Sequence, residues 1–130
     1  MDDRKKDLSK YRLEQSAETM KAANTCFTGN LYRDTLNRSY YAAFYAVKAV
    51  LALDGVDFKR HKDAVAYFNQ HYVKEEKFER EIGRKLGKLK QLREKSDYDD
   101  FYIVSAEEAK EQLEASTEIC EAVREFLNCK

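Results

Sequence analysis

The stretch YYAAFYAVKAVLAL, at residues 40–53, decides the fold of this chain. Only Lys48 is charged among these fourteen residues, and a membrane-spanning helix needs about 20 apolar residues. We therefore expect a central helix at about residues 31–53 that is buried on most sides by neighbouring helices or by a second subunit.

This helix is expected to have two different faces, because successive side chains turn by about 100°. One face carries small residues that permit close helix packing: Ser39, Ala42, Ala43, Ala46 and Val50. The other face mixes aromatic and polar side chains: Arg33, Asn37, Tyr40, Tyr41, Phe44 and Lys48. The mixed face is interpreted either as core aromatics with hydroxyls at the rim or as a surface for a ligand or a second subunit.

The composition around this stretch favours an all-α protein. The 130 residues include no proline and only four glycines, and proline is costly in helices but common in turns. The length predicts a single domain over residues 1–130. The hydrophobic fraction of 43% is too high for a disordered tail.

Five helices are expected, four long and one short, in an up-and-down bundle. Their approximate ranges are 7–27, 31–53, 61–72, 75–95 and 105–127. Asp7 is the expected N-cap of the first helix, and Ser105 with Glu108 forms a capping box for the last. The first helix is expected to bury a stripe at helical spacing: Leu13, Ala17, Met20, Asn24 and Phe27.

Two glycines, Gly83 and Gly87, stand inside the fourth expected helix. Each costs about 1 kcal/mol relative to alanine. They indicate either the close approach of another helix or ligand, or a flaw tolerated on an exposed face.

Charge is unevenly distributed although the formal net charge is zero. Residues 73–95 contain nine basic and five acidic residues, whereas residues 96–118 contain one basic and eight acidic residues. The simpler interpretation is that the fourth and fifth helices are antiparallel neighbours with complementary surfaces. The alternative is a basic face that is open to phosphates.

Several classes of site and location are disfavoured. The two histidines, His61 and His71, are ten residues apart with no cysteine nearby, so we expect neither a metal site nor a cofactor. The dispersed glycines form no phosphate-binding loop. Three cysteines without a secretory leader favour free thiols in the cytoplasm, and no apolar run is long enough to place the chain in a membrane.

Arg93 is the most informative charged residue, because its spacing from Ile82 and Leu89 places it on the apolar side of the fourth helix. A buried guanidinium must be paired, and Asp97 lies four residues later. Arg93 therefore either forms a structural pair with Asp97 or presents its charge to a phosphate in a cleft. Tyr98 and Tyr102 border this position.

His61 is the second candidate, since it opens a helix within the basic sequence KRHK at residues 59–62. Such a cluster at a helix N-terminus is suited to an anion. The alternative interpretation is a solvated turn.

Two segments, LYRDTLNRSYYAAFYAVKAVLALDGVDFKRH at 31–61 and LREKSDYDDFY at 92–102, resemble the HEPN domain family. The resemblance covers about residues 8–127. It implies a bundle of four long helices with a short extra one, usually a homodimer. It also implies a minimal nucleotidyltransferase as partner in a toxin–antitoxin pair, and ribonuclease activity without a metal in many members.

The ribonucleases of that family have an arginine, four to six residues, and then a histidine, often with a tyrosine two residues later. Arg93 matches the arginine, but Tyr98 stands at the histidine position after a four-residue spacer, and Asp100 stands at the tyrosine position. Tyrosine, with a pKa near 10, is a poor general base at neutral pH. The resemblance also implies that, in paired systems, the tyrosine of this motif can be modified by nucleotidyl transfer. Tyr98 or Tyr102 would replace that tyrosine only by analogy.

Three hypotheses follow. The first is a non-catalytic HEPN domain that binds a nucleotide, RNA or a nucleotidyltransferase through one set of candidates: Arg93, Asp97, Tyr98, Arg33, Asn37, Tyr41, Lys48 and His61. The second is an atypical ribonuclease in which Arg93 binds phosphate and His61 or Tyr98 handles protons. The third is a purely structural dimerisation module.

Overall fold

The computed structural model describes residues 3–128, and every element of regular secondary structure within that range is a helix. The elements are α1 (Asp3–Thr28), α2 (Tyr32–Leu53), α3 (His61–Phe68), the π-helical turn η1 (Asn69–Val73), α4 (Arg80–Tyr98) and α5 (Ala106–Asn128). The all-α prediction and the count of four long helices plus one short helix are confirmed.

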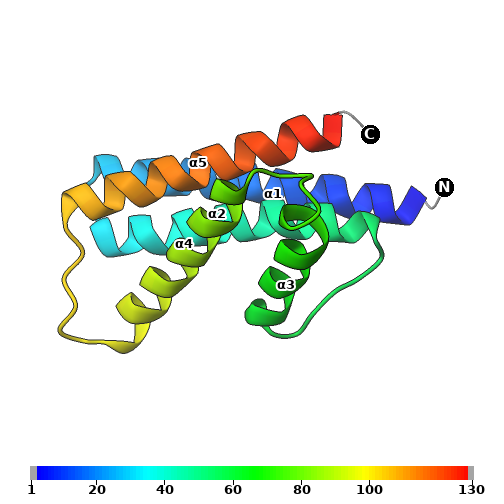
Figure 1. Cartoon of the computed structure of the whole chain (residues 1–130). Coiled ribbons are helices and arrows are strands. Elements are labelled where there is room, and N and C mark those ends of the chain that lie inside the picture. Colours follow the sequence, from blue (N-terminus) through cyan, green and yellow to red (C-terminus); the bar gives the residue numbers. More distant parts are fainter. Residues whose placement is uncertain (1–2, 129–130) are drawn as a thin grey trace.

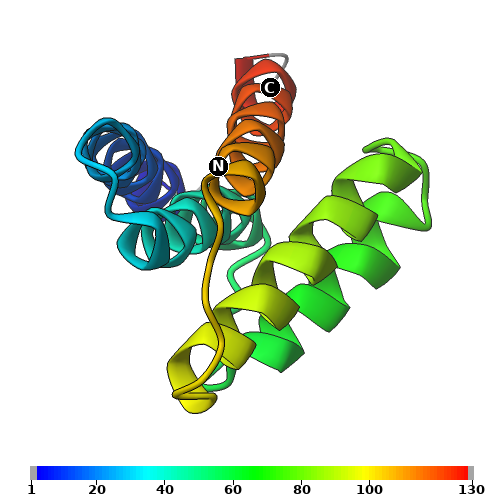
Figure 2. The same cartoon turned by 90° about the vertical axis from the view of Figure 1, so that its left-hand side faces the viewer.

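The helices form two groups that meet on α2. Helices α1, α2 and α5 lie side by side, with α1 running opposite to α2, while α3–η1 and α4 form a hairpin that crosses them obliquely (Figure 1). Figure 2 looks nearly along α1, α2 and α5 and shows α3 and α4 as a separate antiparallel pair. Thirteen of the 22 residues of α2 are buried, so the expected central helix is confirmed.

The buried face of α1 differs from the expected stripe. The buried residues are Ser9, Arg12, Ser16 and Ala23, whereas the predicted Asn24 is exposed and Leu13, Ala17, Met20 and Phe27 are only half-buried. Apolar periodicity therefore identified the edge of the buried face instead of its centre.

The physical reason is that serine hydroxyls of α1 bind the backbone of α2. Ser9 Oγ donates to the Ala49 carbonyl at 2.7 Å, and Ser16 Oγ donates to the Ala42 carbonyl at 2.7 Å. A buried hydroxyl with a hydrogen-bond partner is tolerated in a core. The small residues on this face of α2 let the two helices approach closely enough for these bonds.

Several predicted helix ends are also wrong. Helix α1 begins at Asp3, so Asp7 lies inside it and does not cap it. Helix α4 begins at Arg80 instead of residue 75, because Glu76 has a left-handed φ of 60° and Glu79 is extended. Helix α4 also continues to Tyr98, beyond the expected end at residue 95.

The capping box of α5 is confirmed by two reciprocal bonds. The Glu108 amide donates to Ser105 Oγ at 3.0 Å, and the Ser105 amide donates to Glu108 Oε1 at 3.4 Å. The expected third helix forms as α3 and then widens into η1, a π-helical turn of the kind that often occurs at functional sites.

The two glycines of α4 have different environments. A Cβ on Gly83 would lie 2.8 Å from Asn69 Oδ1 and 3.2 Å from Val73 Cγ1, so Gly83 permits the close approach of η1. A Cβ on Gly87 would meet nothing within 4 Å. Each of the two interpretations is therefore correct for one glycine.

Three further observations concern the charges on α4 and α5, the cysteines, and the apolar character of the helices. Among the ion pairs of the described residues, the one between Lys85 and Glu118 joins the basic α4 to the acidic α5. Cys26 and Cys120 are free thiols, and Cys129 lies outside the described residues. Over residues 3–128, no helix combines the length and the apolar character needed to cross a bilayer.

Candidate functional site

An aromatic and basic cluster forms where α2, α3 and α4 meet. Helix α2 contributes Tyr40, Tyr41 and Phe44, α3 contributes its first residue His61, and α4 contributes Arg93. These five residues are called the Tyr40 cluster below. The spacing of Tyr40 and Phe44 places both on one face of α2, so one helix face meets the ends of two others.

Arg93 lies over the two tyrosine rings of this cluster. Its guanidinium carbon is 4.8 Å from the centroid of Tyr40 and 5.6 Å from that of Tyr41, which is cation–π distance. Nη1 donates to Asp97 Oδ2 at 3.0 Å, so the expected Arg93–Asp97 pair forms. Nε is buried, and no hydrogen-bond partner for it is present among the described residues.

The surroundings of Arg93 keep its guanidinium protonated. Its side chain is only 12% exposed, and burial lowers its pKa. Tyr41, Tyr40 and Asp97 outweigh that effect, so the pKa of Arg93 is raised overall. The cluster therefore contains a permanent cation with one guanidinium edge partly committed to Asp97.

His61 is joined to Tyr40 by a hydrogen bond. Its Nδ1 lies 3.0 Å from the Tyr40 hydroxyl, and its ring centroid lies 4.2 Å from that of Phe44. Burial lowers the pKa of His61, and the positive charges of Arg93 and Lys48 lower it further. The imidazole is therefore neutral at neutral pH.

The direction of this hydrogen bond decides what His61 can do. Burial raises the pKa of Tyr40 although the charge of Arg93 and a hydrogen bond with it act in the opposite direction, so the hydroxyl keeps its proton. Arg93 has only donors, so His61 Nδ1 is the one acceptor for that proton among residues 3–128. We therefore assign Tyr40 as the donor and Nδ1 as the acceptor. A neutral imidazole that accepts at Nδ1 carries its proton on Nε2, where it is a donor.

Lysines flank the cluster on two sides. Lys48 Nζ is 5.8 Å from the Phe44 ring centroid and 3.5 Å from Asp57 Oδ1. Lys90 pairs with Glu94, which lowers the pKa of that carboxyl. The cluster thus combines flat aromatic rings with positive charge, a combination suited to a phosphate attached to a planar group.

Not every residue proposed from the sequence lies in this cluster. Arg33 is exposed and donates to the carbonyls of Ser96 and Tyr102, so it fastens the end of α4 to the following loop. Asn37 is half-buried one helical turn before Tyr41. Tyr98 is 83% exposed, and its side chain makes no hydrogen bond, ion pair or ring contact with any other residue in the described range.

Tyr102 is hydrogen-bonded to α5 and lies outside the Tyr40 cluster. Its hydroxyl donates to Glu108 Oε2 at 2.7 Å. Burial and Glu108 together raise the pKa of Tyr102 to about 12. The hydroxyl is thus protonated and committed to α5.

Tyr40 and Phe44 belong to the mixed face that was interpreted as a possible ligand surface, but they are not among the individually named site candidates. The signal was available in their position, since both share a helix face with Tyr41 and Lys48. Their importance depends on His61 and Arg93, which are distant in sequence. For metals, no group of three or more His, Cys, Asp and Glu side chains within residues 3–128 is arranged to hold an ion.

Comparison with known proteins gives a family match over nearly the whole chain. The family model described as "HEPN domain" matches residues 9–126. A "UPF0332 protein" of Thermotoga maritima is 25% identical over 123 residues, which covers 95% of this chain and 93% of the relative.

Two archaeal relatives carry a functional name. "Putative toxin MJ0605" of Methanocaldococcus jannaschii is 36% identical over 86 residues, covering 66% of this chain and 64% of that protein. "Putative toxin MJ0142" of the same organism is 26% identical over 105 residues, covering 81% of this chain and 71% of that protein.

Proposed function

We propose that this chain, which belongs to the HEPN domain family, is a toxin-like HEPN domain. In this proposal the Tyr40 cluster binds a phosphate of RNA or of a nucleotide without cleaving it. The family match and the names of the two archaeal relatives support the toxin-like role.

The observation that carries the proposal is the hydrogen bond from Tyr40 to His61 beside the Arg93 guanidinium. A protonated Nε2 on His61 donates a hydrogen bond to a phosphate oxygen, and Arg93 adds a full positive charge. Charge-assisted bonds of this kind are about twice as strong as neutral ones. Tyr41 offers a ring on which a base can stack.

Binding without cleavage follows from the same geometry. A general base needs a free lone pair, but the lone pair of His61 is directed to Tyr40. The family's ribonuclease histidine is replaced by Tyr98, which is largely exposed to solvent. Neither residue is therefore placed to accept a proton from a ribose hydroxyl.

The proposal is tested with a fluorescent single-stranded RNA and the variant Arg93→Lys, measured by fluorescence anisotropy. Lysine keeps the charge but loses the planar donors, so we expect RNA affinity to fall about tenfold, which corresponds to about 1.4 kcal/mol. Arg84→Lys is the matched control, because Arg84 is an exposed arginine of α4 that pairs with Glu81. Equal affinity of both variants would contradict the proposal.

An atypical ribonuclease is the second candidate, and the neutral state of His61 favours it. It requires the other tautomer, with Nδ1–H donating to Tyr40 and Nε2 free to accept a proton. Incubation of the chain with a mixed RNA panel in EDTA tests it. Cleavage that is lost in His61→Gln at unchanged melting temperature would establish this function in place of the first.

We further propose that a second copy of the chain docks on the loop after α4, which makes the protein a homodimer. Tyr98 at the end of α4 and Phe101 and Ile103 in the following loop are 83%, 93% and 84% exposed. Large apolar side chains exposed close together in sequence are typical of a protein contact. Light scattering on Phe101→Asp should show a monomer where the wild type is a dimer.

A different result would identify a different partner. A wild type that is monomeric alone, but forms a complex with a minimal nucleotidyltransferase through Phe101, would assign this surface to that enzyme. A stable dimer with no RNA or nucleotide binding would favour the purely structural module.

A further inference from the structure

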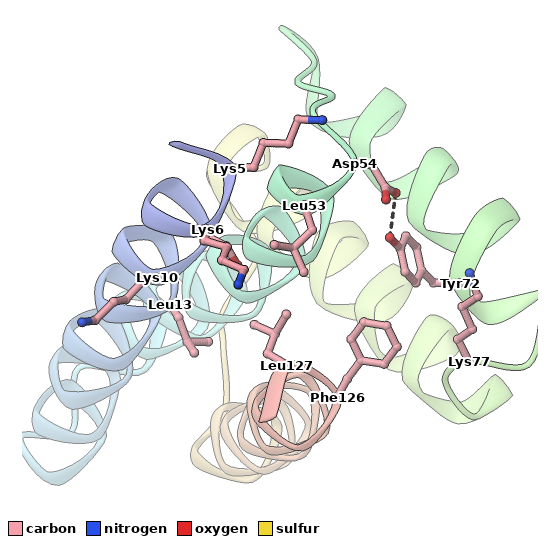
Figure 3. Close-up of a pocket in the computed structure, with 11 residues that line it drawn as sticks. Lys5, Lys6, Lys10, Leu13, Leu53, Asp54, Tyr72, Lys77, Phe126 and Leu127 are labelled. Atoms are coloured by element: carbon pink, nitrogen blue, oxygen red, sulfur yellow. Dashed lines mark hydrogen bonds between the residues drawn. The ribbon is translucent and has the colours of Figure 1, made fainter. Parts of the chain in front are cut away.

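A second candidate site lies at the other end of the bundle, away from the Tyr40 cluster. A pocket of about 530 Å³ opens between the N-terminal half of α1, the C-terminal ends of α2 and α5, and η1 (Figure 3). This volume is within the range of small-molecule sites, about 300–1,000 Å³. It contains no residue of the Tyr40 cluster.

Four lysines surround this pocket: Lys5, Lys6, Lys10 and Lys77. None of the four is in an ion pair with any residue in the 3–128 range. Figure 3 shows Lys5, Lys6 and Lys10 on α1 and Lys77 beside η1 on the opposite side of the pocket, with the amine of Lys10 directed away from its centre. Since the chain has as many acidic as basic residues, four unpaired lysines around one pocket form a local excess of positive charge.

The lining between the lysines is apolar. Leu13, Leu53 and Leu127 come from three different helices, and the rings of Phe126 and Tyr72 complete the lining. A concave apolar surface with a few polar groups at its edge is typical of a ligand site.

The one acidic residue that lines the described pocket, Asp54, is already occupied. Its Oδ2 accepts hydrogen bonds from the hydroxyls of Tyr72 at 2.6 Å and Tyr67 at 3.1 Å. Asp54 therefore orients the Tyr72 ring and leaves the lysine ammonium groups available. Lys77 Nζ lies 5.1 Å from the centroid of that ring.

We propose that this pocket binds a small amphiphilic anion, a molecule with an apolar body and one carboxylate, phosphate or sulfonate head. The leucines and rings take the body, and the lysines take the head. Nucleic acid fits less well, because a phosphate backbone alone would leave the apolar lining uncovered.

Two probes separate aliphatic from aromatic ligands: 1-anilinonaphthalene-8-sulfonate, followed by its fluorescence, and dodecanoate, followed by displacement of that dye. We expect saturable binding of the dye at one site per chain. Complete displacement by dodecanoate would identify an aliphatic body as a ligand, whereas dye binding without displacement would restrict the site to aromatic bodies. Both results support the proposal.

The double variant Lys6→Glu/Lys10→Glu should weaken dye binding about tenfold. Lys21→Glu/Lys110→Glu changes the net charge equally at exposed lysines of α1 and α5 that do not line the pocket, and it should bind within about twofold of the wild type. Leu13→Trp fills the pocket and should weaken binding without changing net charge. Near-UV circular dichroism verifies that each variant is folded.

Three results would overturn the proposal. Equal affinity of the two charge variants would show that the lysines of the pocket are not used. Unchanged affinity in Leu13→Trp would show that the dye binds elsewhere. Binding to phosphatidylglycerol vesicles without saturable binding of either probe would identify a membrane-binding surface instead of a small-molecule site.

Discussion

The hydroxyl of Tyr40 and Nδ1 of His61 are 3.0 Å apart, which joins the middle of α2 to the first residue of α3. Arg93 of α4 lies over the same tyrosine ring. One tyrosine therefore fixes the relative position of three helices and brings together the two residues best suited to bind a phosphate.

Replacement of His61 by glutamine should make the stability of the protein less sensitive to acid. Burial, Arg93 and Lys48 hold the pKa of His61 below its unfolded value of about 6.5. As pH falls through 6.5, the unfolded chain takes up a proton that the folded chain resists, so this site reduces stability progressively. Urea denaturation at pH 7.5 and pH 5.0 should show a smaller loss for His61→Gln than for the wild type.

His71→Gln removes the other imidazole and serves as the composition-matched control. For each variant, the quantity to compare with the wild type is the loss in free energy of unfolding between pH 7.5 and pH 5.0. Parallel curves for His61→Gln and the wild type would mean that the proposed burial and charge effects on His61 are absent.

Tyr40→Phe should lower the free energy of unfolding by about 1 kcal/mol, the usual net contribution of a hydrogen bond. The ring packing with Phe44 and Arg93 is retained, so the lost contribution is that of the hydroxyl. Tyr45→Phe is the control on the same helix, because the hydroxyl of Tyr45 has no hydrogen-bond partner in the part of the chain that the structure describes. Thermal or urea unfolding measures both, and an equal effect would contradict the assigned bond.

Alanine at the two glycines of α4 should have opposite effects on stability. Gly87→Ala should raise the free energy of unfolding by about 1 kcal/mol, since alanine favours the helix and its Cβ meets nothing. Gly83→Ala should lower it by about 1 kcal/mol, because the clash with Asn69 and Val73 exceeds the same helical gain. Equal effects in chemical denaturation would mean that η1 does not approach α4 closely.

Arg33→Met should loosen the connection between α4 and α5. Arg33 donates to the Ser96 carbonyl and, at 3.1 Å, to Ser96 Oγ, so its loss removes donors from a buried serine. We expect a loss of about 1 kcal/mol and faster limited proteolysis within residues 99–105. Arg38→Met, an exposed arginine of the same helix, should be cleaved at the wild-type rate.

The sequence was a better guide to the helices than to their contacts. The apolar run of α2 and the absence of proline predicted an all-helical chain, because both act through local backbone preference. The stripe predicted for α1 was wrong in phase. Apolar periodicity does not register serines that are buried by hydrogen bonding to another helix, as Ser9 and Ser16 are.

For the candidate site too, the sequence predicted a contact within one helix better than the position of a neighbouring side chain. Arg93 and Asp97 were expected to pair because they are four residues apart on one helix, and they do. Tyr98 is adjacent in sequence, but it extends into solvent because it is the last residue of α4.

By itself, then, the sequence determined what local periodicity encodes: helical class, the central position of α2, the α5 capping box and the side of α4 on which Arg93 lies. Only the tertiary structure decided that His61 meets Tyr40 and that four lysines surround an apolar pocket. Those arrangements depend on how the α3–α4 hairpin and the ends of α1 and α5 pack against α2. Such contacts join residues far apart in the chain, and a one-dimensional pattern carries no information on them.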